Sequence, residues 1–263
     1  MIVFLGILCI ITYFCKLFTL SIFNFQLRPI ILGPIIGLLL GNFSVGMYFG
    51  AYLELVFLAF FGVGGAPPPE AEMAGIVGIA CGIYGEQSLG GVLVAGLIAG
   101  YCGLLVFLKA VKPFSSKMAY IEIQAVDAGQ VRRFEKLHRI VILTVPLFYL
   151  PLVVLLASFC VYGLFPVLNS LPDFFIKALT IFAYLFPVMS VSQLIKTEWK
   201  WQSLPFLLLG FCLAAYFKGN ALTVLLLVGV LAVLLMYPKT NSATQEAAQS
   251  LQTSSDSEED DFF

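Results

Sequence analysis

Three acids, Glu54, Glu70 and Glu72, stand in an unusual stretch of the chain, LELVFLAFFGVGGAPPPEAEM, which covers residues 53–73, and the first two carry the argument. Glu54 lies inside an apolar run, and Glu70 follows three consecutive prolines. An ionised acid at the centre of a membrane helix costs roughly 2.5–3.5 kcal/mol unless it faces protein, water or a ligand. Carboxylates bind sugar hydroxyl groups and also bind cations. The pair therefore predicts a site for a sugar or for a coupling ion such as Na⁺ or H⁺.

The residues between the two acids cannot continue a regular helix. Gly64 and Gly65 permit tight turns, and Pro67, Pro68 and Pro69 each lack a backbone donor. A helix break at membrane depth leaves backbone groups unpaired, which only a polar cavity tolerates. We therefore expect these five residues to form a hinge beside a cavity.

Each acid also has a structural alternative. Glu54 could lie near the membrane interface and form hydrogen bonds that only hold the fold. Glu70 could stand at the start of a new helix, where the helix dipole favours a carboxylate. The cavity interpretation requires both side chains to point inward.

The composition places the chain in a membrane. Of its 263 residues, 60% are hydrophobic and 11% are charged, and the mean hydropathy is +1.00. A soluble domain carries roughly a quarter charged residues. We expect an all-α polytopic membrane protein with broken helices and re-entrant hairpins, whose N-terminal apolar run is retained as a first helix.

Helices that cross a bilayer need about 20 apolar residues. Stretches that meet this requirement are 2–23, 46–64, 89–108, 140–165, 173–195 and 221–237. Two shorter apolar stretches, 29–41 and 204–217, contain or begin near prolines. Such segments are typical of discontinuous or re-entrant helices that line a polar cavity.

Charge defines the regions of the chain. Residues 109–139 hold seven of the fourteen lysines and arginines, which predicts a cytoplasmic, basic, amphipathic loop. This loop either lies against the membrane surface or docks a partner. It divides a membrane transport domain, 1–239, into N-terminal helices (1–108) and C-terminal helices (140–239). The acidic remainder, 240–263, is expected to be a disordered cytoplasmic tail.

Catalytic motifs are absent from the sequence. It contains no GxxxxGK[ST], GxSxG or HExxH pattern, and His138 is the single histidine. One imidazole makes no metal site. The six cysteines fall in apolar segments and are expected to be buried small side chains. We expect transport or binding, with no cofactor, no metal and no nucleic acid.

A longer stretch, RPIILGPIIGLLLGNFSVGMYFGAYLELVFLAFFGVGGAPPPEAEMAG, resembles the signature region of subunit IIC of the mannose–fructose–sorbose family of bacterial phosphotransferase (PTS) sugar transporters. GEQSLG, with Gln87, and LPFLLLGFCLAAYFKGN near the C-terminus also resemble the family's pattern. The shared elements are Arg28-Pro29, the spacing of Gly37, Gly41 and Asn42, the pair Gly46 and Gly50, Glu54, Gly64-Gly65, and Glu70 sixteen residues after Glu54. The chain departs from the pattern at Ala59 and at Ala183-Tyr184-Leu185, where the family often has glycines.

The resemblance implies a sugar-translocating IIC subunit in the bacterial cell membrane. Such a subunit works with a IID membrane subunit, in an expected trimer of IIC–IID pairs, and with the IIA and IIB cytoplasmic phosphocarriers. Glu54, Glu70 and Gln87 would line the site for a hexose or amino sugar, which IIB phosphorylates on the inner side. The phosphorelay histidines would be on IIA and IIB, so no phosphorelay residue is expected in this chain.

Two other functions fit the same composition. An ion-coupled secondary transporter would act without phosphorylation, with Glu54 or Glu70 binding the ion. A membrane scaffold that transports nothing would make no use of paired acids in a cavity.

Overall fold

The computed structural model describes residues 1–21, 27–60, 62, 66–197, 199–201, 204–217, 223 and 226–231. Every regular element within these ranges is a helix. The chain divides into two units, Met1–Thr197 and Glu198–Phe263. Gly64, Gly65 and the expected tail 240–263 lie outside the described residues.

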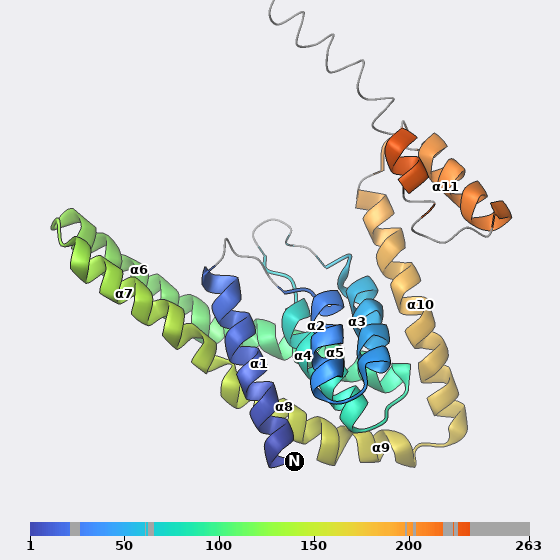
Figure 1. The fold of residues 1–263 in the computed structure, drawn as a ribbon, viewed down its shortest axis with the longest axis horizontal. Helices are drawn as coiled ribbons and strands as arrows, with labels where there is room; N and C mark the ends of the chain where they lie inside the picture. Colours follow the sequence, from blue (N-terminus) through green and yellow to red (C-terminus); the bar gives the residue numbers. More distant parts are fainter. Residues whose placement is uncertain are drawn as a thin grey trace, which may run out of the picture. The chain divides into compact units, whose positions relative to one another are not determined.

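The helices of the first unit include several that are long and apolar enough to cross a bilayer (Figure 1). These membrane-length segments are Ile2–Leu20, Leu89–Asp127, Val131–Ser170 and Asp173–Thr197. They confirm the expected all-α membrane class, and they include the predicted spans near the N-terminus, at 140–165 and at 173–195. The predicted span 221–237 is described only at residues 223 and 226–231.

Two short helices, α2 (Pro29–Leu39) and α3 (Phe43–Phe57), follow the first long helix α1 (Ile2–Ser21). Their 11 and 15 residues make helices about 16 and 22 Å long, whereas the hydrocarbon core is about 30 Å thick. The predicted crossing at 46–64 is therefore wrong in its limits. The α2–α3 pair instead has the dimensions of a re-entrant hairpin, a structure that the sequence predicts for 29–41 but not for 46–64.

Glycines let α2 and α3 approach until their backbones touch. A methyl group on Gly46 would lie 2.5 Å from both Gly33 O and Gly37 Cα, and one on Gly50 would lie 2.8 Å from Gly33 Cα. Gly33 and Gly37 on α2, and Gly46 and Gly50 on α3, each form a G-x-x-x-G pair. Such pairs place small residues on one helix face, as in membrane helix–helix contacts.

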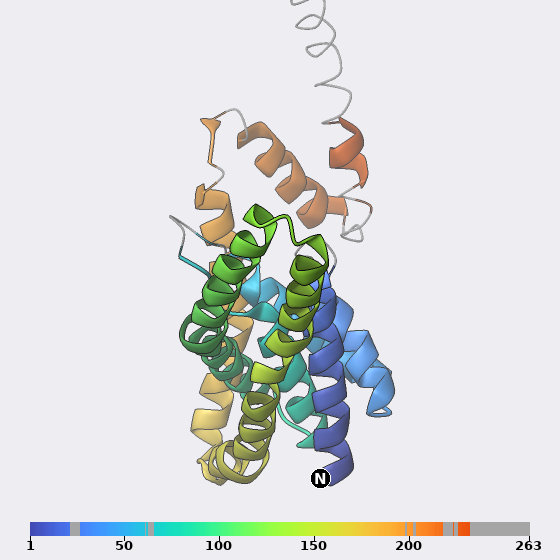
Figure 2. The same ribbon diagram turned by 90° about the vertical axis from the view of Figure 1, so that its left-hand side faces the viewer.

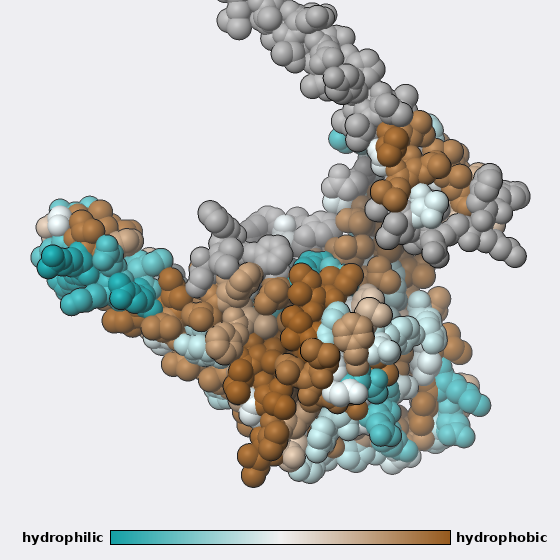
Figure 3. Space-filling view, viewed as in Figure 1, coloured by the Kyte–Doolittle hydropathy of each residue, from teal (hydrophilic) through white to brown (hydrophobic). Residues whose placement is uncertain are grey.

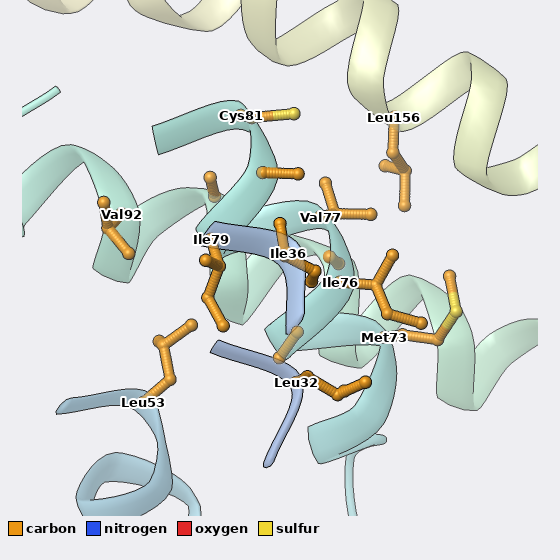
Figure 4. Packing of buried hydrophobic residues seen from close by; sticks show 14 of the residues in the cluster. Leu32, Ile36, Leu53, Met73, Ile76, Val77, Ile79, Cys81, Val92 and Leu156 are labelled. Atoms are coloured by element: carbon orange, nitrogen blue, oxygen red, sulfur yellow. The ribbon is translucent and has the colours of Figure 1, made fainter. Parts of the chain in front are cut away.

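The centre of the unit is α4 (Ala71–Tyr84), which is buried on every side from Ala71 to Gly82. Apart from Glu72, the helix is apolar around its whole circumference over this range, as expected of a helix surrounded by others. Figure 4 shows its side chains packed among residues of the neighbouring helices. The labelled neighbours are Leu32 and Ile36 of α2, Leu53 of α3, Val92 of α5 (Leu89–Val106) and Leu156 of α8 (Leu150–Phe159).

The next helix, α5 (Leu89–Val106), continues through a π-helical turn, η1 (Phe107–Val111), into α6 (Lys112–Asp127). The chain then turns at Gly129, whose φ is 68°. It returns through α7 (Val131–Thr144) and a 3₁₀ turn, η2 (Val145–Phe148), into α8. Figures 1 and 2 show α6 and α7 side by side, projecting from the other helices of the unit.

This projection, the α6–α7 hairpin, contains most of the predicted basic loop 109–139. The loop is thus built of two helices that prolong the neighbouring spans. Pro113 and Pro146 stand at the bases of the two helices, where proline accounts for the departure from regular α-helix. His138 Nδ1 lies 3.6 Å from Glu122 Oε2 across the hairpin. The cytoplasmic position of this segment stays a prediction.

After α8, the turn η3 (Cys160–Leu164) and α9 (Phe165–Ser170) lead to α10 (Asp173–Thr197). Two buried hydrogen bonds hold α10 against α3. Tyr52 donates to Ala183 O at 2.9 Å, and Ser190 donates to Val56 O at 2.8 Å. Ala183 is the small residue at this contact, while Tyr184 and its neighbour Leu185 point to the exposed side. In the second unit, α11 (Leu204–Phe217) is a short helix at the position predicted.

Candidate functional site

Glu70 is the N-cap residue of α4, but its side chain makes no capping hydrogen bond. Its carboxylate instead contacts two residues that are distant in sequence. Glu70 Oε2 lies 2.8 Å from Lys16 Nζ of α1, and Glu70 Oε1 accepts a 2.6 Å hydrogen bond from Tyr149 OH. The backbone fixes this position, because Glu70 N donates to Gly100 O of α5 at 3.1 Å. Helix capping alone therefore does not explain Glu70.

Lys16 joins a second carboxylate to the first. Its Nζ lies 3.2 Å from Glu72 Oε2 and 4.2 Å from the centre of the Tyr149 ring, in cation–π geometry. Thr19 donates to Glu72 Oε2 at 3.3 Å. Lys16, Glu70, Glu72, Thr19 and Tyr149 are called the buried cluster from here on.

The buried cluster is unbalanced. It holds two carboxylates and one ammonium group, and Glu72 is only 1% exposed. Within the described residues, Glu72 Oε1 has no hydrogen-bond partner. A buried polar atom without a partner costs about 1–3 kcal/mol. The cluster therefore has unused capacity to bind a donor.

A cavity of about 260 Å³ opens beside the buried cluster. This volume is near the lower end of small-molecule pockets, which start at about 300 Å³. An ammonium group, a carboxylate and two hydroxyl groups face an otherwise apolar wall, as in pockets that orient a small polar ligand. The lining residues are Lys16, Thr19, Leu20, Glu70, Phe107, Val111, Val145 and Tyr149.

The wall of this cavity includes the base of the α6–α7 hairpin. Phe107 and Val111 belong to η1, Val145 belongs to η2, and Tyr149 follows η2 directly. The irregular turns that interrupt the two long helices thus lie at the cavity. This arrangement joins the hairpin to the carboxylate of Glu70 through a single hydrogen bond.

Glu54 lies outside the buried cluster. Its Oε1 accepts a 2.7 Å hydrogen bond from Arg28 Nε, and its Oε2 lies 3.4 Å from the backbone nitrogen of Ile30. The Glu54 side chain is 16% exposed and that of Arg28 is 36% exposed. The charge of Glu54 is thus balanced by Arg28, and its carboxylate accepts a hydrogen bond from the backbone of the first turn of α2.

The remaining predicted residues occupy other places. Pro67, Pro68 and Pro69 lie in a segment without regular structure that leads into Glu70, as expected of a helix break. Gln87 lies beyond the opposite end of α4, about 20 Å away along the helix. Its Nε2 donates to Gly85 O at 2.8 Å, beside a cavity of only about 20 Å³. The structure does not bring Gln87 and Glu70 together.

Four residues of the buried cluster are missing from the sequence prediction, and one of them, Thr19, gives no signal in an apolar helix. Lys16 is the single charge in the first apolar run, so the reasoning applied to Glu54 could have found it. Glu72 stands two residues after Glu70 in the same quoted stretch. Tyr149 gives no signal in the sequence, because one tyrosine in an apolar helix is unremarkable.

This chain is similar to known proteins over most of its length. The family described as "PTS system sorbose-specific IIC component" matches residues 2–235. The mannose-specific EIIC component of Escherichia coli (strain K12) is 26% identical over 84% of this chain and 84% of its own. N-acetylgalactosamine permease IIC component 1 of the same strain is 26% identical over 90% of this chain and 88% of its own. The fructose permease IIC component of Bacillus subtilis (strain 168) is 27% identical over 73% of this chain and 71% of its own.

Two solved structures share the fold. One, described as a membrane protein, superposes with a TM-score of 0.80 at 23% identity. The other is a chain from the complex of the mannose transporter ManYZ with microcin E492, with a TM-score of 0.55 at 24% identity. Each covers 92% of this chain and 98% of its own length.

Proposed function

Because the chain belongs to the family of sorbose-specific IIC components of the phosphotransferase system, we propose that this membrane sugar-translocating subunit binds its sugar at the buried cluster. The ion pair between Lys16 Nζ and Glu70 Oε2, 2.8 Å long and facing the 260 Å³ cavity, is the observation that carries the proposal. The substrate class is a hexose or an amino sugar.

The chemistry of the cavity supports this assignment. A sugar presents neighbouring hydroxyl groups, each of which both donates and accepts hydrogen bonds. Lys16 and Thr19 supply donors, the Glu70 carboxylate supplies an acceptor, and Phe107 gives an apolar surface for the face of the ring. The unpartnered Glu72 Oε1 is a further acceptor in the same cluster.

Family membership implies work with other PTS components. We propose a IID membrane subunit as the partner in the bilayer, IIA and IIB as the cytoplasmic phosphocarriers, and a trimer of IIC–IID pairs as the assembly. The C-terminus is assigned to the cytoplasmic side, together with the basic hairpin. The sugar leaves the cluster on that side, where IIB phosphorylates it, and the added charge prevents its return.

Glu54 and Gln87 keep a place in the proposal as residues of the transport path. Glu54 holds the start of α2 against α3 through Arg28 and Ile30, which suits gating better than direct sugar contact. Gln87, at the far end of α4, suits a contact that the sugar makes at a different stage from that with Glu70.

The test is phosphoenolpyruvate-dependent phosphorylation of a panel of hexoses and amino sugars. Membrane vesicles would carry the chain with its IID partner and would be supplied with the soluble phosphocarriers. Glu70→Gln is expected to lower kcat/KM for the preferred sugar tenfold or more, since a hydrogen bond to a charged group contributes about 1.5–3 kcal/mol.

Glu86→Gln is the matched control, because Glu86 is an exposed acid in the turn after α4. Its activity should equal that of the wild type. Normal activity of Glu70→Gln at normal expression would overturn the assignment of the site. Sugar uptake in cells that lack the phosphocarriers would instead contradict the phosphotransferase mechanism.

A further inference from the structure

Four basic residues share the outer face of α7. Arg132, Lys136 and Arg139 are separated by three, four or seven positions, and Arg133 stands three positions before Lys136, which places them on one side of a helix. All four are exposed. They are called the basic stripe, and they stand close to the tip of the α6–α7 hairpin.

One acid, Glu135, stands among the four bases of the basic stripe, three positions after Arg132 and four before Arg139, so the stripe keeps an excess of positive charge. Arg133 donates a 3.2 Å hydrogen bond to Gln130, but the other three residues make no hydrogen bond or ion pair within the part of the chain that the structure describes. Like charges at these spacings repel one another. The stripe borders an open groove of about 660 Å³, lined by Gly129, Gln130, Val131, Arg132, Arg133 and Lys136. An anion in this groove would relieve the repulsion.

The same face of α7 becomes apolar directly after the stripe. Ile140 and Leu143, four and seven residues after Lys136, are 50% and 47% exposed. Figure 3 shows that the hairpin carries a hydrophilic edge beside hydrophobic atoms in its outer part, and that it is hydrophobic where it joins the other helices. In a membrane protein, exposed apolar side chains of this kind face lipid tails. The basic stripe therefore begins where the lipid-facing surface ends.

The length of the helix that contains α7 also supports a position of the basic stripe outside the hydrocarbon. The helix that contains α7 runs for 40 residues, Val131–Ser170, or about 60 Å, roughly twice the hydrocarbon thickness. Part of it must lie outside the hydrocarbon. Arg132 to Arg139 covers about 10 Å of helix, comparable with the headgroup layer of about 5–8 Å in one leaflet.

We propose that the basic stripe is a binding site for the phosphate groups of anionic phospholipids. Guanidinium groups pair with phosphate in bidentate fashion, and basic clusters next to a membrane helix attract anionic headgroups. The unbroken passage from apolar to basic residues on one helix face favours lipid over an acidic protein as the occupant. This proposal does not depend on the sugar site.

The full chain, reconstituted in vesicles, would be tested with spin-labelled phosphatidylglycerol and spin-labelled phosphatidylcholine. The wild type is expected to prefer the anionic lipid, and 1 M salt should reduce that preference. Arg132→Gln/Lys136→Gln/Arg139→Gln should lower the relative affinity at least fivefold. The control is Lys109→Gln/Lys112→Gln/Lys117→Gln, which removes the same charge from exposed positions of η1 and α6. This variant should keep most of the wild-type preference for the anionic lipid.

Equal losses in the two triple variants would overturn the proposal, because they would show a general effect of charge. An unchanged lipid preference in the α7 variant, with loss of sugar phosphorylation when the soluble carriers are added, would assign the stripe to an acidic protein instead. Circular dichroism and gel filtration of both variants would establish that each is folded.

Discussion

Lys16 and Glu70 are 54 residues apart in the sequence, yet their charged groups lie 2.8 Å apart in the interior of the first unit. Removing two charges from water costs several kcal/mol for each ion, and the pair must recover that cost through its geometry. Tyr149 and Thr19 help by donating to the two carboxylates. A fold without a use for such a pair would be as stable with apolar residues in its place. The pair therefore points to function.

Substitution of Lys16 by Met should leave two carboxylates buried without a counter-charge. We expect a loss of about 3–5 kcal/mol in stability, the usual cost of removing one partner of a buried ion pair. Thermal unfolding in detergent would measure it. Lys117→Met, at an exposed position of α6, should change little. The double variant Lys16→Met/Glu70→Gln should regain part of the loss, and no recovery would argue against coupling of the two residues.

Tyr149→Phe removes only the hydroxyl group that donates to Glu70 Oε1. The carboxylate then loses one of its two anchors, so we expect KM for the sugar to rise about tenfold with the fold intact. Tyr162→Phe is the control, because Tyr162 is 69% exposed. Equal kinetics of the two variants would show that the Tyr149 hydroxyl group does not position Glu70.

Gly46→Ala should prevent the close packing of α2 and α3. The added methyl group would lie 2.5 Å from backbone atoms of α2, and backbone cannot yield as a flexible side chain can. We expect a loss of about 2–3 kcal/mol or more, within the range of severe overpacking. Gly6→Ala in α1 meets nothing within 4 Å and should be neutral or slightly stabilising. Comparable thermal unfolding of both variants would contradict this account of the hairpin.

The Arg28–Glu54 pair distinguishes a structural or gating role from sugar contact. Glu54→Gln alone leaves Arg28 without its partner, and we expect reduced uptake. Arg28→Gln/Glu54→Gln removes both charges, and uptake should partly recover if the pair only holds α2 to α3. Sugar uptake in cells, normalised to expression, is the measurement. A double variant as inactive as Glu54→Gln, with raised KM, would support direct contact between Glu54 and the sugar.

Much of the fold could be predicted from local pattern. Apolar runs of sufficient length predict α1, α10 and the long helices that contain α5 and α8, because hydrophobic length is a local property. The prolines at 67–69 predict the break before α4, because the effect of proline on a helix is also local. The limits of α3 could not be predicted, because its apolar run continues past Phe57, where the helix ends.

The site was harder to predict than the fold. Glu70 was expected in a cavity, and it does line one, but its role in binding sugar stays a prediction. Its partners come from α1 and from the start of α8, and contacts between distant segments leave no trace in one sequence. Gln87 was grouped with Glu70 by resemblance, and the length of α4 separates them.

Equilibrium binding of radiolabelled sugar to the purified IIC–IID complex tests the central claim most directly. With the preferred sugar from the phosphorylation panel, Glu70→Gln and Lys16→Gln should each weaken binding tenfold or more, while Glu86→Gln binds as the wild type does. Wild-type affinity in a folded Glu70→Gln complex would contradict the claim that the sugar binds at the buried cluster.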